Sequence, residues 1–186
     1  TICKRYKGNQ AHAEYLEQMA GKFFDLLQKY HGLGERERLL LRLAAILHDC
    51  GKFISMSAPG ECAYQIIMST EILGISHMER EMVASIVRYN TMELPNFNEF
   101  DGKLGNDEYL IVMKLAAILR VCNALDRSHR QKFADMKLTI KDSNIVITTA
   151  YPDNITLEKK TLQDKQDFFE EVYGLGFEIK QKKKKQ

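Results

Sequence analysis

The chain has 186 residues, of which 45% are hydrophobic and 28% are charged, and its formal net charge is +2 at pH 7. These values are typical of a soluble globular protein that is long enough for one sizeable core. The small net charge excludes a global electrostatic argument for nucleic-acid binding.

Apolar residues recur with helical spacing through most of the chain. The spacing predicts helices over residues 9–31, 35–49, 62–73, 76–90 and 107–126, with a loop over residues 91–106. Gly32 and Gly34 end the first helix, and Ser76 and Glu79 have the capping-box spacing at the start of the fourth. The helix over residues 35–49 is apolar almost all round, so we expect it to be central and buried.

The pattern changes after the last of these helices. Residues 136–151, MKLTIKDSNIVITTAY, alternate around a polar turn and predict a β-hairpin. A helix over residues 157–173 follows, and GFEIKQ at residues 176–181 is compatible with a third strand. The sequence therefore predicts a mainly α protein, with a helical domain over residues 1–130 and a small ββαβ (α+β) subdomain over residues 131–186.

Cysteine usage and hydropathy bear on the location of the protein. The four cysteines, Cys3, Cys50, Cys62 and Cys122, form no CxxC pair, and there is no signal peptide and no apolar run long enough to cross a bilayer. We therefore expect a cytoplasmic protein with reduced thiols and no membrane contact. Because the first residue is Thr1 rather than Met, the sequence is compatible with a piece of a longer protein.

The stretch LAAILHDCGKF at residues 43–53 ends an apolar helix with two ionisable side chains, His48 and Asp49. Buried polar groups need partners. Either this pair closes the helix end by mutual hydrogen bonding, or it binds a divalent metal ion together with His12 in the first turn of the first helix. Beside such an ion, Lys52 would add positive charge for a substrate phosphate.

Several segments in a fixed order resemble one protein family. LAAILHDCGKFIS, YQIIMSTEILGISHMEREMVASIVRYN, KLAAILRVCNALDRSHRQ and FFEEVYG are similar to the C-terminal HD-type region of the exopolyphosphatase/guanosine pentaphosphate phosphatase family, and NQAHAEYLEQMAGKFFDLL fits the helix before its HD segment. The resemblance covers nearly the whole chain. It implies an HD-type helical bundle followed by a small α+β end.

The resemblance also implies site residues. His12, His48 and Asp49 match the first histidine and the His-Asp pair of the HD metal-binding pattern, while Asn123 stands where the family pattern has its last aspartate ligand. An amide oxygen brings no negative charge, so a divalent ion (Mn, Mg, Fe or Zn) would be bound more weakly, or not at all.

Two further positions differ from the histidines expected in HD relatives. They are occupied by Cys62 and Asn90. Cys62 is either a small core residue, as most free cysteines are, or a replacement ligand that would favour zinc.

Basic residues predict a phosphate-binding surface. LDRSHRQK clusters four basic residues just past a helix end, namely Arg127, His129, Arg130 and Lys132. Lys52 and Arg88 are candidates for the same cleft. The alternative is favourable charge at a helix C-terminus together with solvation. The terminal KQKKKKQ segment, residues 180–186, is either a solvated end or a contact for a polyanion.

These observations leave three functional hypotheses. The first is an accessory domain that binds polyphosphate or guanosine polyphosphate, supports homodimerisation, or does both. In the family, the phosphoanhydride chemistry belongs to an N-terminal domain with an actin-like ATPase fold, which nothing in this chain resembles. The second is a metal-dependent HD-type phosphohydrolase that acts through His12, His48, Asp49 and Asn123. The third is a structural bundle with a vestigial metal site.

Overall fold

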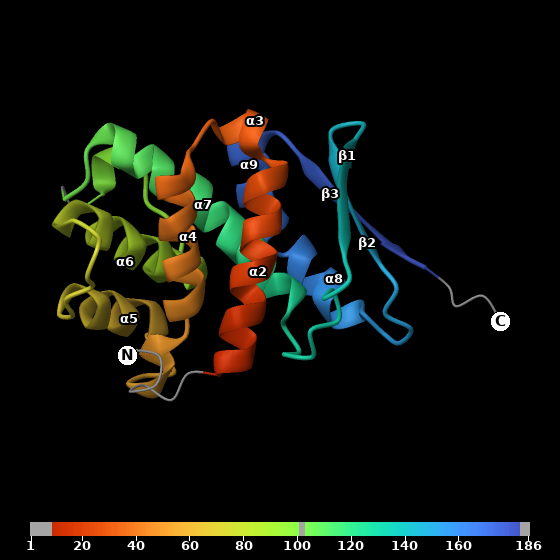
Figure 1. Ribbon diagram of the computed structural model, residues 1–186, viewed down its shortest axis with the longest axis horizontal. Coiled ribbons are helices and arrows are strands. Elements are labelled where there is room, and N and C mark those ends of the chain that lie inside the picture. Colours follow the sequence, from red (N-terminus) through yellow and green to blue (C-terminus); the bar gives the residue numbers. More distant parts are fainter. Residues whose placement is uncertain (1–8, 101–102, 183–186) are drawn as a thin grey trace.

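The computed structural model describes residues 9–100 and 103–182. Its N-terminal part is helical, and a small mixed sheet with its own helices follows (Figure 1). Cys3 and residues 183–186 of the basic segment lie outside the described residues. The elements of the helical part are α2 (Gln10–Leu26), α3 (Gln28–His31), α4 (Glu35–Leu47), α5 (Pro59–Met68), α6 (His77–Thr91) and α7 (Asn106–Leu125), with 3₁₀ turns at Cys50–Phe53 and Phe97–Glu99.

The C-terminal part is built from β1 (Lys137–Lys141), β2 (Asn144–Thr149), α8 (Thr156–Gln163), α9 (Gln166–Tyr173) and β3 (Gly176–Gln181). The sheet order is β1-β2-β3, with β1 antiparallel and β3 parallel to β2. Asp142 and Ser143 both have positive φ, 49° and 58°, as the tight turn of a two-residue hairpin requires. The prediction of a mainly α fold with a small α+β end is confirmed.

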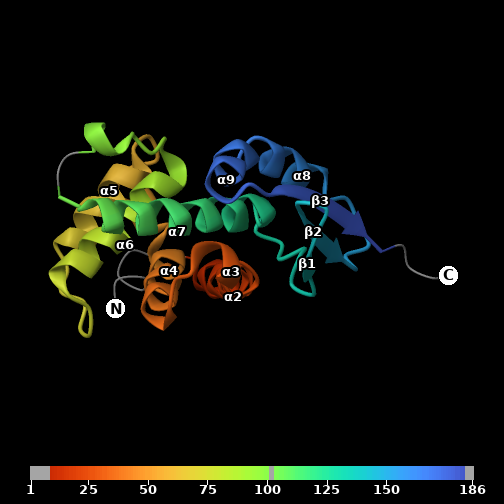
Figure 2. The ribbon, with the colours of Figure 1, turned by 90° about the horizontal axis from the view of Figure 1, so that it is seen from above.

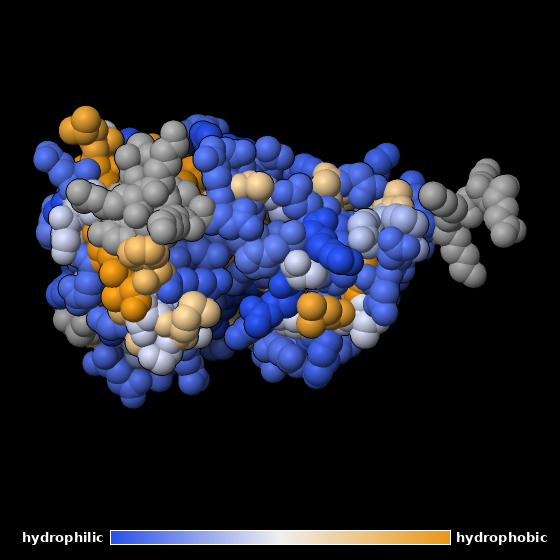
Figure 3. Space-filling view, turned by 90° about the horizontal axis from the view of Figure 1, so that it is seen from below, coloured by the Kyte–Doolittle hydropathy of each residue, from blue (hydrophilic) through white to orange (hydrophobic). Residues whose placement is uncertain are grey.

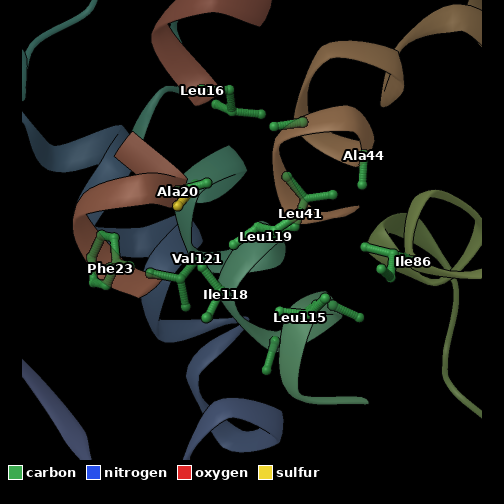
Figure 4. Packing of buried hydrophobic residues seen from close by; sticks show 14 of the residues in the cluster. Leu16, Ala20, Phe23, Leu41, Ala44, Ile86, Leu115, Ile118, Leu119 and Val121 are labelled. Atoms are coloured by element: carbon green, nitrogen blue, oxygen red, sulfur yellow. The ribbon is translucent and has the colours of Figure 1, made fainter. Parts of the chain in front are cut away.

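Helix α7 lies at the centre of the molecule, between α2 and α4 on one side and α8 and α9 on the other (Figure 2). In Figure 4, side chains from α2, α4, α6 and α7 meet in one apolar cluster. The same cluster continues into the sheet, where the ring centroids of Phe169 and Phe177 are 4.8 Å apart and Phe23 contacts Phe177. The helical part and the sheet therefore share a continuous hydrophobic core.

Several predicted helix boundaries differ from the structure. The helix expected over residues 9–31 is interrupted at Leu27, and Gly32, with φ 65°, ends the second piece. The helix expected over residues 62–73 spans Pro59–Met68 instead, because Pro59 occupies the first helical turn, where its missing N–H costs nothing. The helix expected over residues 157–173 is divided into α8 and α9 at Asp164 and Lys165.

The chain turns sharply after α4. This helix ends at Leu47 rather than at Asp49, and Gly51 lies in the following 3₁₀ turn. A Cβ on Gly51 would lie 1.9 Å from the carbonyl oxygen of Pro59 and 2.6 Å from the amide nitrogen of Ala63. Glycine is thus needed here because α5 packs directly on this backbone, which fixes the exit of the chain from His48 and Asp49.

Candidate metal and phosphate site

Three helix ends meet at one place in the bundle. Helix α2 begins there with His12 in its first turn, and α4 and α7 end there with His48 and Asp126 as their C-cap residues. His12, His48 and Asp126 are 2%, 5% and 1% exposed. The C-terminal ends of α4 and α7 carry partial negative charge from their free carbonyl groups, so a buried cation at this place is electrostatically favoured by both helices.

His12 is fixed by hydrogen bonds of both its backbone and its side chain. Its backbone N–H donates to the side chain of the N-cap residue Asn9, over 3.1 Å, and its ring Nδ1 lies 2.6 Å from Oδ2 of Asp126. A carboxylate can only accept a hydrogen bond, so Nδ1 of His12 carries the proton. Its Nε2 is therefore left with a lone pair in the neutral imidazole.

His48 is oriented in the same way by the backbone. Its Nδ1 lies 2.7 Å from the carbonyl oxygen of Ala45, which fixes the proton on Nδ1 and the lone pair on Nε2. The Nε2 atoms of His48 and His12 are only 3.1 Å apart, and Oδ1 of Asp49 is also 3.1 Å from Nε2 of His48. Three electron-pair donors thus face one small space.

Asp49 carries a full negative charge. Burial alone would raise its pKa, but the neighbouring His48 ring and the ammonium group of Lys52 hold the pKa of Asp49 well below its usual range. The Lys52 Nζ–Asp49 Oδ1 distance is 2.6 Å. Lys52 therefore lies beside the His-Asp pair.

The donor set fits a divalent cation. The ligand atoms of His12, His48 and Asp49 all lie within 4.8 Å of one another. Two histidine nitrogens and a carboxylate oxygen suit zinc, manganese or iron. The Nδ1–H groups of both histidines already have acceptors, Asp126 and the Ala45 carbonyl, which is the usual outer-shell support of a metal-binding histidine.

His129 extends this cluster toward the surface. Its ring stacks on that of His12, with centroids 3.9 Å apart and planes inclined by 11°. Burial and the nearby His12 lower the pKa of His129, which favours its neutral form. Its neighbours Arg127 and Arg130 are exposed. Two guanidinium groups therefore flank a residue that touches the buried cluster.

Other predicted site residues lie elsewhere or make other contacts. Arg88 forms an ion pair with Glu61, over 2.9 Å, and lies over the ring of Tyr64. Cys62 is half-buried and lines a groove together with Ile54 and with residues of α5 and of the turn after it, and it is not part of the histidine cluster. The structure thus does not place Arg88 or Cys62 with the other predicted residues.

Asn123 is half-buried on α7, one turn before Asp126. It therefore belongs to the helix end that contributes to the cluster. Asp126 itself was not singled out in the sequence as a site residue, because its role depends on a contact with a residue 114 positions away. The only signal in the sequence was its position three residues after Asn123.

Asn90 has an unusual environment. It is 3% exposed, and among the described residues neither its Oδ1 nor its Nδ2 has a hydrogen-bond partner. A buried amide without such partners is rare in folded proteins. The backbone around Asn90 is tightly packed: a Cβ on Gly60 would contact Arg88 and Thr91, and Arg120 on α7 donates to the Tyr89 carbonyl.

The face at which α4 ends is mainly hydrophilic (Figure 3). A patch of hydrophobic atoms stands out on the left of this view. Three apolar residues at and just after the 3₁₀ turn that follows α4 are well exposed: Phe53 (54%), Ile54 (59%) and Met56 (78%).

In the described part of the chain, no helix is both long enough and apolar enough to span a membrane.

The sequence of the chain was compared with protein families and with curated proteins. The sequence model of a protein family described as Ppx/GppA phosphatase, domain III, matches residues 1–167. A search of curated proteins finds no match to this chain.

Proposed function

Because the chain belongs to the Ppx/GppA phosphatase family, as its domain III, we propose that it is an accessory domain that binds polyphosphate or guanosine polyphosphate at the histidine cluster. The family membership confirms the resemblance inferred from the sequence. The observation that supports binding at this place is the stacking of His129 on His12. Arg127 and Arg130 are exposed and lie within two residues of His129, beside a cluster that suits a cation.

Each group has a distinct role in this proposal. His12, His48 and Asp49 would hold a divalent ion, with Asn123 as a further oxygen donor. When bound, such an ion polarises phosphoryl oxygens and neutralises their charge. Arg127 and Arg130 supply planar donors that suit phosphate oxygens, and Lys52 supplies a compact charge. Arg88 is engaged with Glu61 and would contribute only if that pair were to open.

The first experiment is a titration of the chain with long-chain inorganic polyphosphate, with manganese or with chelator. We expect the variant Arg127→Gln/Arg130→Gln to bind at least about 10-fold more weakly, since each charged hydrogen bond contributes roughly 1.5–3 kcal/mol. The matched control is Lys137→Gln/Lys141→Gln, which removes the same charge from exposed positions of β1. Equal weakening in both variants would show that binding depends on net charge alone and would contradict the proposal.

A metal-dependent phosphohydrolase is the second candidate. The convergence of His12, His48 and Asp49, with Asp126 behind His12, favours it. The amide of Asn123 in place of a carboxylate argues against it, because it lowers the affinity for a divalent ion. Metal-stimulated phosphate release that disappears in His48→Ala would establish this activity. A metal-free chain that is equally stable with His48→Ala would instead support a vestigial site.

The partners of the domain are part of the same proposal. The family implies a larger exopolyphosphatase-type protein, and an N-terminal domain with an actin-like ATPase fold is the expected neighbour, in the cytoplasm. The exposed Phe53, Ile54 and Met56 offer an apolar surface for that domain or for a second copy of the chain. Sedimentation of the chain and of Met56→Glu would test homodimerisation, which must weaken in the variant if this surface mediates it.

A further inference from the structure

The segment that carries Arg127, His129 and Arg130 has an unusual backbone. After α7 ends, His129 and Gln131 both adopt positive φ, 55° and 52°. Such values are unfavourable for residues other than glycine, and they persist only where surrounding contacts hold them. The contacts that hold residues 126–132 therefore decide whether His129 stacks on His12.

One set of contacts comes from the end of α7. The backbone N–H of His129 donates to the carbonyl of Asp126 over 2.9 Å, and that of Gln131 donates to Oδ1 of Asp126 over 2.8 Å. Since Oδ2 of Asp126 also accepts from His12, this carboxylate joins the segment to the histidine cluster. These bonds hold the first half of the segment.

The second set comes from α8, which lies beside the chain that leaves α7 (Figure 1). Glu158 on α8 is completely buried. Its Oε1 accepts from the hydroxyl of Ser128 over 2.5 Å, and its Oε2 is 3.0 Å from Nζ of Lys132. Nζ of Lys132 also donates to the carbonyl of Asn154 over 2.8 Å.

Glu158 thus contacts the segment both before and after the two residues with positive φ, His129 and Gln131. Ser128 precedes His129, and Lys132 follows Gln131. Burial alone would raise the pKa of Glu158, but the hydrogen bonds from Ser128 and Lys132 keep it below its usual range. A charged carboxylate inside the protein holds donors more firmly than a neutral amide.

We propose that Glu158 is a positioning residue for phosphate binding: it holds segment 126–132 in the conformation that stacks His129 on His12 and directs Arg127 and Arg130 to the same place. The expected effect on phosphate binding rests on the proposed function, whereas the contacts of Glu158 with the segment do not depend on it. It assigns the small C-terminal α+β part a role at a site whose metal-binding residues all lie in the helical part.

The test separates positioning from stability. The variant Lys132→Met/Glu158→Leu replaces the buried ion pair with apolar side chains of similar size, a change that often preserves or raises stability. It removes the bonds to Ser128 and Asn154. Ser128→Ala removes one bond and leaves the ion pair in place. The matched control is Lys160→Gln/Asp164→Asn, which removes an exposed ion pair from the same helix.

Two measurements are made on each variant. Trypsin cleavage after Arg127 and Arg130, located by mass spectrometry, reports opening of the segment, because cleavage follows the population of the open form. We expect it to rise roughly 10–100-fold in the double variant, from the loss of charged hydrogen bonds. The rise must be smaller in Ser128→Ala and absent in the control.

The second measurement is polyphosphate affinity, which we expect to fall about 10-fold in the double variant while thermal unfolding stays within a few degrees of the wild type. Unchanged cleavage and affinity in both the double variant and Ser128→Ala would overturn the role of Glu158. If the wild type binds no polyphosphate, the proposed function fails, but the cleavage measurement still decides whether Glu158 holds the segment.

Discussion

Asp126 connects the histidine cluster to the segment with the exposed arginines through hydrogen bonds accepted by both of its carboxylate oxygens. Its two oxygens have different partners: Oδ2 lies 2.6 Å from Nδ1 of His12, and Oδ1 accepts from the backbone N–H of Gln131. Both partners are donors, so both oxygens must be acceptors. Only a carboxylate satisfies this arrangement, because an asparagine has one acceptor and one donor.

Asp126→Asn is therefore expected to weaken metal binding. An amide can accept from His12 or from Gln131 but not from both, so His12 loses its orientation or the segment loses a bond. Loss of an outer-shell partner of a metal-binding histidine typically costs about 10–100-fold in affinity. Calorimetric titration with zinc or manganese measures it. Asp153→Asn, at an exposed position, should bind like the wild type, and equal affinity in all three proteins would refute the role of Asp126.

At the scale of elements, the packing of α5 on the 3₁₀ turn after α4 determines where the His-Asp pair points. Gly51→Ala would insert a methyl group 1.9 Å from the Pro59 carbonyl oxygen, which belongs to the backbone and cannot rotate away. We expect a loss of about 1–3 kcal/mol in the free energy of unfolding, the usual cost of overpacking. Urea denaturation measures the loss.

The control for this change is Gly34→Ala. A Cβ on Gly34 would meet only the Glu37 side chain, at an ordinary 3.5 Å, and its φ is negative. Because alanine is a poorer N-cap than glycine, a loss below about 1 kcal/mol is expected. If both variants lost the same amount, the close approach of α5 would not be what requires glycine at position 51.

The start of α6 gives a pH-dependent contribution to stability. Glu79 accepts from the Ser76 backbone N–H over 2.7 Å and forms an ion pair with Arg36, and these contacts lower the pKa of Glu79 to about 2, the Arg36 bond most strongly. Because the folded pKa lies below the unfolded value of about 4.3, the contribution is complete above that value. It is lost as the pH falls toward 2.

Glu79→Gln tests this directly, since glutamine preserves the capping box but removes the charge. The difference in melting temperature between wild type and variant should be constant above about pH 5 and should shrink toward zero near pH 2. Arg36→Gln should show the same convergence. A difference that persists at pH 2 would mean that the variant acts through packing rather than through the ion pair.

The positions of most helices and strands could be predicted from the sequence, but several of their boundaries could not. The sequence located α4, α6, α7, the hairpin and β3 because their periods and caps are local. It placed α5 three residues too late although Pro59 marked its start, and it missed the break between α8 and α9, where Asp164 and Lys165 are not helix breakers. Tertiary packing decides such boundaries.

In the candidate site, too, some features can be predicted from the sequence and others cannot. The meeting of His12, His48 and Asp49 could be inferred from helix ends and family resemblance, and the structure brings these residues together. The partnership of Asp126 with His12, the positive φ of His129 and the buried Lys132–Glu158 pair could not be inferred. Each depends on residues distant in sequence, for which neither periodicity nor composition carries a signal.

At the scale of the whole molecule, the net charge of +2 is too small to attract a polyanion by itself, so the placement of basic residues must account for binding. Two clusters of basic residues are candidates for polyphosphate binding: the residues near the histidine cluster and the lysines at positions 182–185. If both contact polyphosphate, binding must weaken steeply with salt, because every cation–phosphate contact releases counterions.

Replacing the four lysines at positions 182–185 with glutamine separates the two groups while it preserves the chain length. Each lost contact should reduce the slope of log K against log salt by roughly 0.7, so a reduction of up to about 3 is expected if all four participate. Fluorescence titrations with polyphosphate from low to high salt measure this slope. A variant with the wild-type slope would confine binding to the residues near the histidine cluster, whereas salt-insensitive binding by the wild type would contradict phosphate recognition through these basic residues altogether.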